Sequence, residues 1–181
     1  MMTDPRLWGL VLNELIVCGV LGLFLYARDW TFERLGFVFH WTDVLWSLVL
    51  FASVYAVFYA AWHLLSWFSV PLPRVHVVSS GVSVQTVIAL VIVNPVFEEV
   101  FVAGYIIAAL KDVRGQTFAI NVSVAIRLLY HLYQGVTGVL SIIPMGLIFA
   151  YWFARKGRLW PLIAAHAIMD VAPLMLIYLR P

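Results

Sequence analysis

Six ionisable side chains lie within apolar stretches of the second half of the chain, where charged residues are otherwise rare. They are Glu98, Glu99, Arg127, His131, His166 and Asp170. Because a charged side chain at a bilayer centre costs roughly 2.5–3.5 kcal/mol on insertion scales, such residues normally face the protein interior, where they pair or line a functional cavity. One glutamate and two histidines suffice for hydrolysis, since they can take a proton from water and stabilise an oxyanion.

In three pairs of polar residues the two members are four positions apart, which places them on one face of a helix. The pairs are Asn94 with Glu98, Arg127 with His131, and His166 with Asp170. Glu98 and Glu99 point about 100° apart on a helix, so we expect one to face a cavity and the other a neighbouring helix. Three helices would then each supply an acid or a base to one site in the core of a helix bundle.

The same residues could hold a metal ion. Glu98, His131 and His166 would form a zinc site with two histidines, one glutamate and an open fourth position. Spacing alone does not separate zinc-assisted hydrolysis from metal-free hydrolysis. The residues are also compatible with a structural polar network or with a haem held by His131 and His166, although the adjacent glutamates have no role in binding haem.

The chain that positions these side chains is strongly apolar. Its 181 residues are 64% hydrophobic and 11% charged, with a mean hydropathy of +0.99, whereas soluble domains carry about 25% charged residues. The net charge of +2 gives no sign of a polyanionic partner. Disordered, nucleic-acid-binding and soluble globular classes are therefore excluded, and we expect a single all-α membrane domain over residues 1–181, with the lipid bilayer as its surroundings.

Apolar stretches predict a bundle of about six membrane-spanning helices. These cover residues 7–27, 44–68, 82–110, 117–133, 136–154 and 159–179. The third contains Pro95, which removes a backbone hydrogen bond, so we expect this stretch to be kinked or broken. The first contains Glu14, which we expect to pair with Arg127 or a backbone carbonyl, or to lie near the interface. The positive-inside rule places the first, third and fifth loops in the cytoplasm and both termini outside.

Three motifs in the second half of the chain resemble those of the CPBP family of intramembrane proteases. They are the pair Glu98-Glu99, the sequence RLLYHLYQG at 127–135, and His166 with Asp170, preceded by GRLWP at 157–161. The family includes type II CAAX prenyl endopeptidases and bacterial homologues linked to bacteriocin processing or immunity. The resemblance implies a CPBP-like catalytic core over about residues 83–178.

The resemblance also implies a role for each residue. Glu98 and His131 would activate a water, and His166 with Asp170 would support the oxyanion, while Glu99 would be a supporting carboxylate. It implies a multi-pass protein of the cell membrane that cleaves a membrane-associated or lipidated protein or peptide, with no required cofactor, or else with zinc. A non-catalytic scaffold or immunity protein of the same family is the second interpretation.

Two positions depart from the family pattern. The family's arginine, four residues after the second glutamate, is replaced by Ala103, so Glu99 lacks its usual partner. We predict that Arg127 supplies this positive charge from the next helix. Asp170 stands where some members have asparagine, and an ionised aspartate cannot donate a hydrogen bond. We therefore expect Asp170 to orient His166 or to carry a proton itself.

Overall fold

The computed structural model describes residues 4–68 and 82–178, which form helices and connecting turns with no β-strand. In chain order these are α1 (Asp4–Tyr26), α2 (Phe32–Leu35), α3 (Thr42–Trp67), α4 (Val84–Glu98), the π-helical segment η1 (Glu99–Tyr105), α5 (Ile106–Arg114), α6 (Gln116–Tyr130), the 3₁₀ turn η2 (Leu132–Gln134), α7 (Gly135–Lys156) and α8 (Trp160–Tyr178). The predicted all-α class is confirmed. The second predicted loop, at 69–81, and the end of the sixth span lie outside the described residues.

Four of the described helices are long and apolar enough to cross a membrane. They are Asp4–Tyr26, Thr42–Trp67, Val84–Arg114 and Gly138–Lys156. The fourth predicted span corresponds to α6, which has 15 residues. The sixth corresponds to α8, whose apolar part, Trp160–Ala172, is shorter than these four helices. The fold is that of an integral membrane protein, and the count of six spans stays a prediction.

The third predicted span is one continuous helix, Val84–Arg114, whose middle part changes from α to π geometry at Glu99. Pro95 lies one turn before this change and cannot donate a backbone hydrogen bond. The side chain of Ser123 on α6 donates to the carbonyl oxygen of Val102 within the π-helical segment at 2.8 Å. The stretch is therefore a single helix with an altered centre, and π-helical segments of this kind often occur at functional sites.

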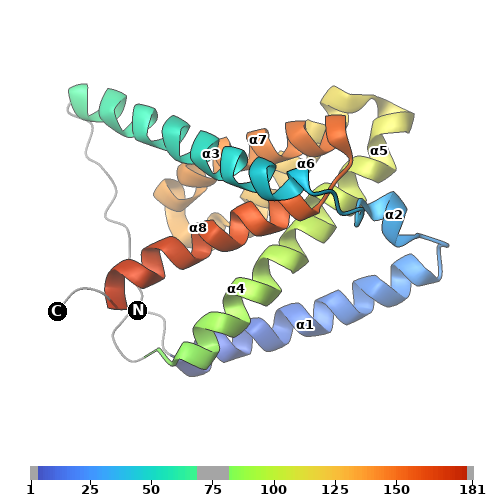
Figure 1. Ribbon diagram of the computed structural model, residues 1–181, viewed down its shortest axis with the longest axis horizontal. Coiled ribbons are helices and arrows are strands. Elements are labelled where there is room, and N and C mark those ends of the chain that lie inside the picture. The colour runs from blue at the N-terminus through green and yellow to red at the C-terminus, as the bar shows by residue number, and fades with distance from the viewer. Residues whose placement is uncertain (1–3, 69–81, 179–181) are drawn as a thin grey trace.

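The helices pack as a series of neighbours with α8 passing through the bundle (Figure 1). The helix α1 packs on α4, α4 on α8, α8 on α3, α3 on α7, α7 on α6, and α6 on α5. Buried apolar side chains such as Phe149, Phe153 and Leu162 form the core between them. The outer faces of α1 and α3 expose large apolar residues, including Ile16 and Leu45, as expected of surfaces that meet lipid.

The aromatic segment between the first two long helices attaches to the start of α8. Gly36 adopts a left-handed conformation with φ of 91° after the short helix α2, and its carbonyl accepts a hydrogen bond from the backbone of Leu159 at 2.9 Å. Arg158 forms an ion pair with the buried Asp43 at 2.7 Å. These contacts fix the beginning of α8, the helix that carries His166.

Candidate active site

Five of the six ionisable residues singled out in the sequence meet in one buried group, called the polar cluster below. Its members and their exposed fractions are Glu98 5%, Glu99 0%, Arg127 2%, His131 7% and His166 5%. The two glutamates come from the junction of α4 and η1, Arg127 and His131 from the end of α6, and His166 from α8. The sixth residue, Asp170, lies at the edge of this group with its side chain 33% exposed.

Arg127 joins the two adjacent glutamates. Its Nη2 lies 2.8 Å from Oε2 of Glu99 and its Nη1 lies 3.2 Å from Oε2 of Glu98. Gly146 of α7 faces the aliphatic part of this side chain, and a Cβ there would lie 3.4 Å from Cδ of Arg127. The contact with Glu99 is the one predicted from the loss of the family's arginine at Ala103, while the second contact, with Glu98, was not predicted.

His131 is held by a backbone carbonyl, so its two ring nitrogens differ. Nδ1 lies 2.8 Å from the carbonyl oxygen of Arg127, and because a carbonyl only accepts, Nδ1 carries the hydrogen. A neutral ring then has its lone pair on Nε2, which lies 3.7 Å from Oε1 of Glu98. That separation is too long for a direct hydrogen bond.

The position of His131 differs from the expectation that it lies within a span. The helix α6 ends at Tyr130, and a 3₁₀ turn follows at Leu132–Gln134. Gly135 then adopts a φ of 75°, a conformation that favours glycine, and α7 begins there. The histidine therefore sits in a sharp turn between two helices, still hydrogen-bonded to the carbonyl four residues before it.

His166 is oriented chiefly by Glu99. Its Nδ1 lies 2.8 Å from Oε1 of Glu99, whereas its Nε2 lies 3.8 Å from Oδ1 of Asp170. The expected orienting partner was Asp170, which is four residues away on the same helix. Glu99 comes closer because it projects from η1 and uses one oxygen for Arg127 and the other for His166.

Two further residues contact Glu98. The hydroxyl of Tyr130 donates to Oε2 at 2.8 Å, and Nδ2 of Asn94 donates to Oε1 at 3.2 Å. Asn94 was expected from its spacing, but Tyr130 was missed, because it is one of eight tyrosines and its type alone gives no signal. Glu14 was expected near Arg127, a backbone carbonyl or the interface, and instead its Oε1 accepts from Nδ2 of Asn94 at 2.9 Å.

Among the described residues, a candidate metal-binding group consists of Glu98, Glu99 and His166, whose donor atoms lie within 4.8 Å of one another. It differs from the predicted zinc set, which had His131 in place of Glu99. Both oxygens of Glu99 already accept hydrogen bonds from protein groups, and Arg127 brings its positive charge to both carboxylates. A divalent cation would therefore meet repulsion from the guanidinium, and these residues fit a metal poorly.

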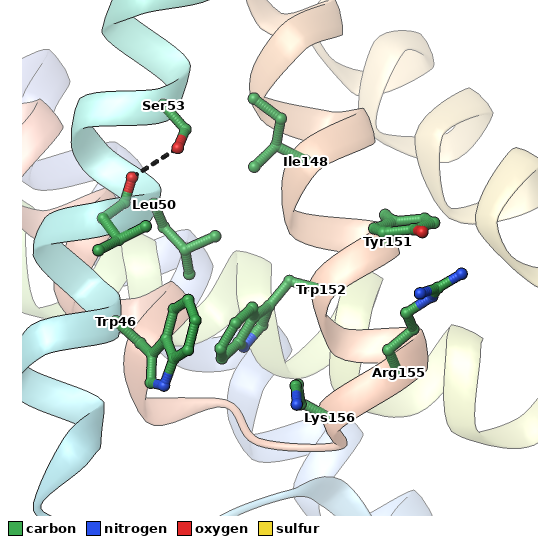
Figure 2. Close-up of a pocket in the computed structure, with 9 residues that line it drawn as sticks. Trp46, Leu50, Ser53, Ile148, Tyr151, Trp152, Arg155 and Lys156 are labelled. Carbon is green, nitrogen blue, oxygen red and sulfur yellow. Dashed lines mark hydrogen bonds between the residues drawn. The ribbon is translucent and has the colours of Figure 1, made fainter.

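A cavity of about 360 Å³ opens elsewhere, between α3 and α7. Figure 2 shows its walls, with Trp46, Leu50 and Ser53 on α3 facing Ile148 and Trp152 on α7. None of the residues that line it belongs to the polar cluster. The cavity is thus separate from the candidate active site.

The fold and the polar cluster together define a helical membrane protein with a buried site of acids and bases. The family described as type II CAAX prenyl endopeptidase Rce1-like matches residues 79–172, more than half of the chain, and the match contains the entire polar cluster. The chain belongs to this family, as its motifs indicated, and membership points to an intramembrane endopeptidase. No curated protein and no solved structure matches the chain.

Proposed function

We propose that the protein hydrolyses a peptide bond in a membrane-associated or lipidated protein and that the polar cluster is its active site. The observation that carries this proposal is the separation of 3.7 Å between Oε1 of Glu98 and Nε2 of His131. A water placed to one side of these two atoms, at about 2.8 Å from each, would donate one hydrogen to each of them. Membership of a family of CAAX prenyl endopeptidases supports a lipidated substrate, which would approach the buried site from the bilayer.

In the proposed reaction Glu98 is the general base. The water oxygen attacks the carbonyl carbon of the substrate while Oε1 takes a proton from the water. Oε2 is unsuited to this role, because Arg127 and Tyr130 both donate hydrogen bonds to it. The carbon–nitrogen bond then breaks as Glu98 returns the proton to the leaving amine. His131 orients the water for the first step, the attack on the carbonyl carbon.

His166 is the proposed donor to the oxyanion. With Nδ1–H bound to Glu99, the doubly protonated ring directs its Nε2–H away from that carboxylate. Two buried carboxylates face a single guanidinium, so a cationic His166 balances the charge of the cluster. Asp170 lies 3.8 Å from Nε2, close enough to attract its proton but too far for a hydrogen bond, which leaves Nε2–H for the substrate.

We propose that this reaction proceeds without a metal, because Arg127 already supplies positive charge beside both glutamates. The rival is zinc held by Glu98, His131 and His166, which would polarise the substrate carbonyl and lower the pKa of a bound water. The two mechanisms use the same side chains, so they are separated by metal analysis and not by the effects of substitutions.

The test is cleavage of prenylated and unmodified peptides by the purified protein in bilayers. We expect Glu98→Gln and His131→Ala to lower kcat by about 10²–10⁴-fold and His166→Ala by about 10²–10³-fold. His63→Ala is the matched control, because this histidine lies on α3 and packs on Tyr59, apart from the polar cluster. Equal cleavage by all variants would contradict the proposal. A folded wild type that cleaves no peptide would favour a scaffold or immunity role.

A further inference from the structure

Glu14 is a buried carboxyl group on α1, a helix that lies outside the residues matched by the family. The helix α1 packs along α4 (Figure 1), and its buried residues are Leu7, Val11, Glu14 and Leu25. Glu14 is only 4% exposed, whereas its apolar neighbours Leu15 and Ile16 are 49% and 67% exposed. An acidic residue on the packed face of a membrane helix is costly and is by default a candidate functional residue.

The side chain of Glu14 reaches the polar cluster through one amide group. Nδ2 of Asn94 donates to Oε1 of Glu14 at 2.9 Å and to Oε1 of Glu98 at 3.2 Å. An amide nitrogen carries two hydrogens and a carboxylate oxygen only accepts, so each hydrogen has its own carboxylate. Rotation of the amide by 180° would turn its oxygen toward two other acceptors. Glu14 therefore helps to fix the orientation of Asn94.

The oxygen of Glu98 that Asn94 contacts is the one proposed to bind and deprotonate water. We propose that Glu14 is a positioning residue for the general base: it holds Asn94, and Asn94 holds Oε1 of Glu98 toward His131. This inference rests on the proposed function. It makes α1, and not only the core matched by the family, part of the catalytic machinery.

A purely structural role explains Glu14 poorly. Its second oxygen, Oε2, is buried and has no hydrogen-bond partner among the described residues. Nor do residues 4–68 and 82–178 supply a lysine, arginine or histidine in an ion pair with it. An apolar side chain would pack between α1 and α4 at lower cost, because it leaves no carboxyl oxygen unsatisfied. The feature that an apolar residue cannot supply is the acceptor for Asn94.

The decisive experiment compares Glu14→Gln, which keeps an acceptor oxygen, with Glu14→Leu, which removes it. We expect Glu14→Leu to lower kcat by about tenfold with little change in KM, and Glu14→Gln to stay within about threefold of wild type. Asn94→Leu should lower kcat equally, and the double variant Glu14→Leu/Asn94→Leu should lose no more than either single variant. Val11→Ala is the matched control, because it weakens the same helix contact without touching the hydrogen bonds, and it should lower Tm while keeping kcat.

Three results would overturn the inference: wild-type kcat in Glu14→Leu, independent losses in the double variant, or an equal loss of kcat in Val11→Ala. A wild type without peptidase activity would refute the proposed function, and the positioning role is then measured by thermal unfolding. In that case the effects of Glu14→Leu and Glu98→Gln on Tm should be non-additive, and this coupling should vanish when Asn94 is replaced by leucine. Additive effects in the presence of Asn94 would refute the positioning role independently of catalysis.

Discussion

Arg127 and Glu99 form a fully buried ion pair in which Nη2 and Oε2 are 2.8 Å apart. The pair connects α6 to the first residue of the π-helical segment, and the other oxygen of Glu99 binds His166 of α8. One carboxylate thus links three helices. Because the same guanidinium also reaches Glu98, it sets the relative positions of the proposed base and the proposed oxyanion donor.

Replacement of Arg127 by leucine should destabilise the protein severely. The variant leaves two adjacent carboxylates buried without the guanidinium that contacts both, and breaking a buried ion pair from one side costs about 3–5 kcal/mol. The measurement is the Tm and the yield of folded protein in detergent. Arg127→Lys should recover part of the stability, since it keeps the charge but cannot place two nitrogens against two carboxylates.

The control for this prediction is Arg155→Leu. Arg155 is an exposed arginine near the end of α7 that stacks on Tyr151, so its loss should change Tm very little. A wild-type Tm in Arg127→Leu would show that the buried ion pair does not stabilise the fold.

The sequence predicted the members of the polar cluster better than their partners. Ionisable residues in apolar stretches are few, so Glu98, Glu99, Arg127, His131 and His166 stood out by type. Which side chains meet depends on how helices far apart in the chain cross one another, and helical spacing only reports residues on one helix. For this reason Asp170 was expected as the partner of His166, whereas Glu99 from another helix lies closer.

The fold, too, was predicted from the sequence only in part. Long apolar stretches predicted the first three long helices to within a few residues, because segments of such length and hydropathy favour membrane-spanning helices. The π-helical segment after Pro95 could not be read from the sequence as more than a kink or a break, since a proline can produce either. The end of α6 before His131 could not be predicted, because the apolar pattern continues past this point. The helix end depends on the turn that Gly135 permits.

Replacement of Gly36 by alanine should destabilise the contact between the segment after α2 and the end of α7. Gly36 has a φ of 91°, and a Cβ there would lie 2.6 Å from the carbonyl oxygen of Gly157 and 2.8 Å from Cε2 of Phe153. Strain at positive φ costs on the order of 1–3 kcal/mol, and overpacking adds about 1–3 kcal/mol. Gly115→Ala is the matched control, because its φ of 86° is similar but a Cβ meets no atom within 4 Å. Equal losses of Tm in both variants would show that the contact with Gly157 is unimportant.

Removal of metal should leave peptidase activity unchanged if catalysis proceeds as proposed. Arg127 lies at 2.8 and 3.2 Å from the two glutamates, so a dication placed between them would be repelled. The measurement is elemental analysis of the purified protein together with cleavage after treatment with a strong chelator. Two results together would favour the zinc-dependent mechanism instead. The wild type would contain stoichiometric zinc that is lost in His131→Ala and His166→Ala, and added zinc would restore the activity of the chelator-treated wild type.

Tyr130 should contribute to catalysis through its hydroxyl group alone. This hydroxyl donates to Oε2 of Glu98 at 2.8 Å and, with Arg127, keeps that oxygen occupied so that Oε1 faces the water. Hydrogen bonds to charged groups contribute about 1.5–3 kcal/mol, so Tyr130→Phe should lower kcat by about ten- to a hundredfold while the ring still packs. Tyr133→Phe is the matched control, since Tyr133 also flanks the ring of His131, but its hydroxyl accepts a hydrogen bond from Gln134 and it is 65% exposed. The comparison is made as kcat and KM on the same peptide, and equal kcat values for the two variants would show that the hydroxyl of Tyr130 does not position Glu98.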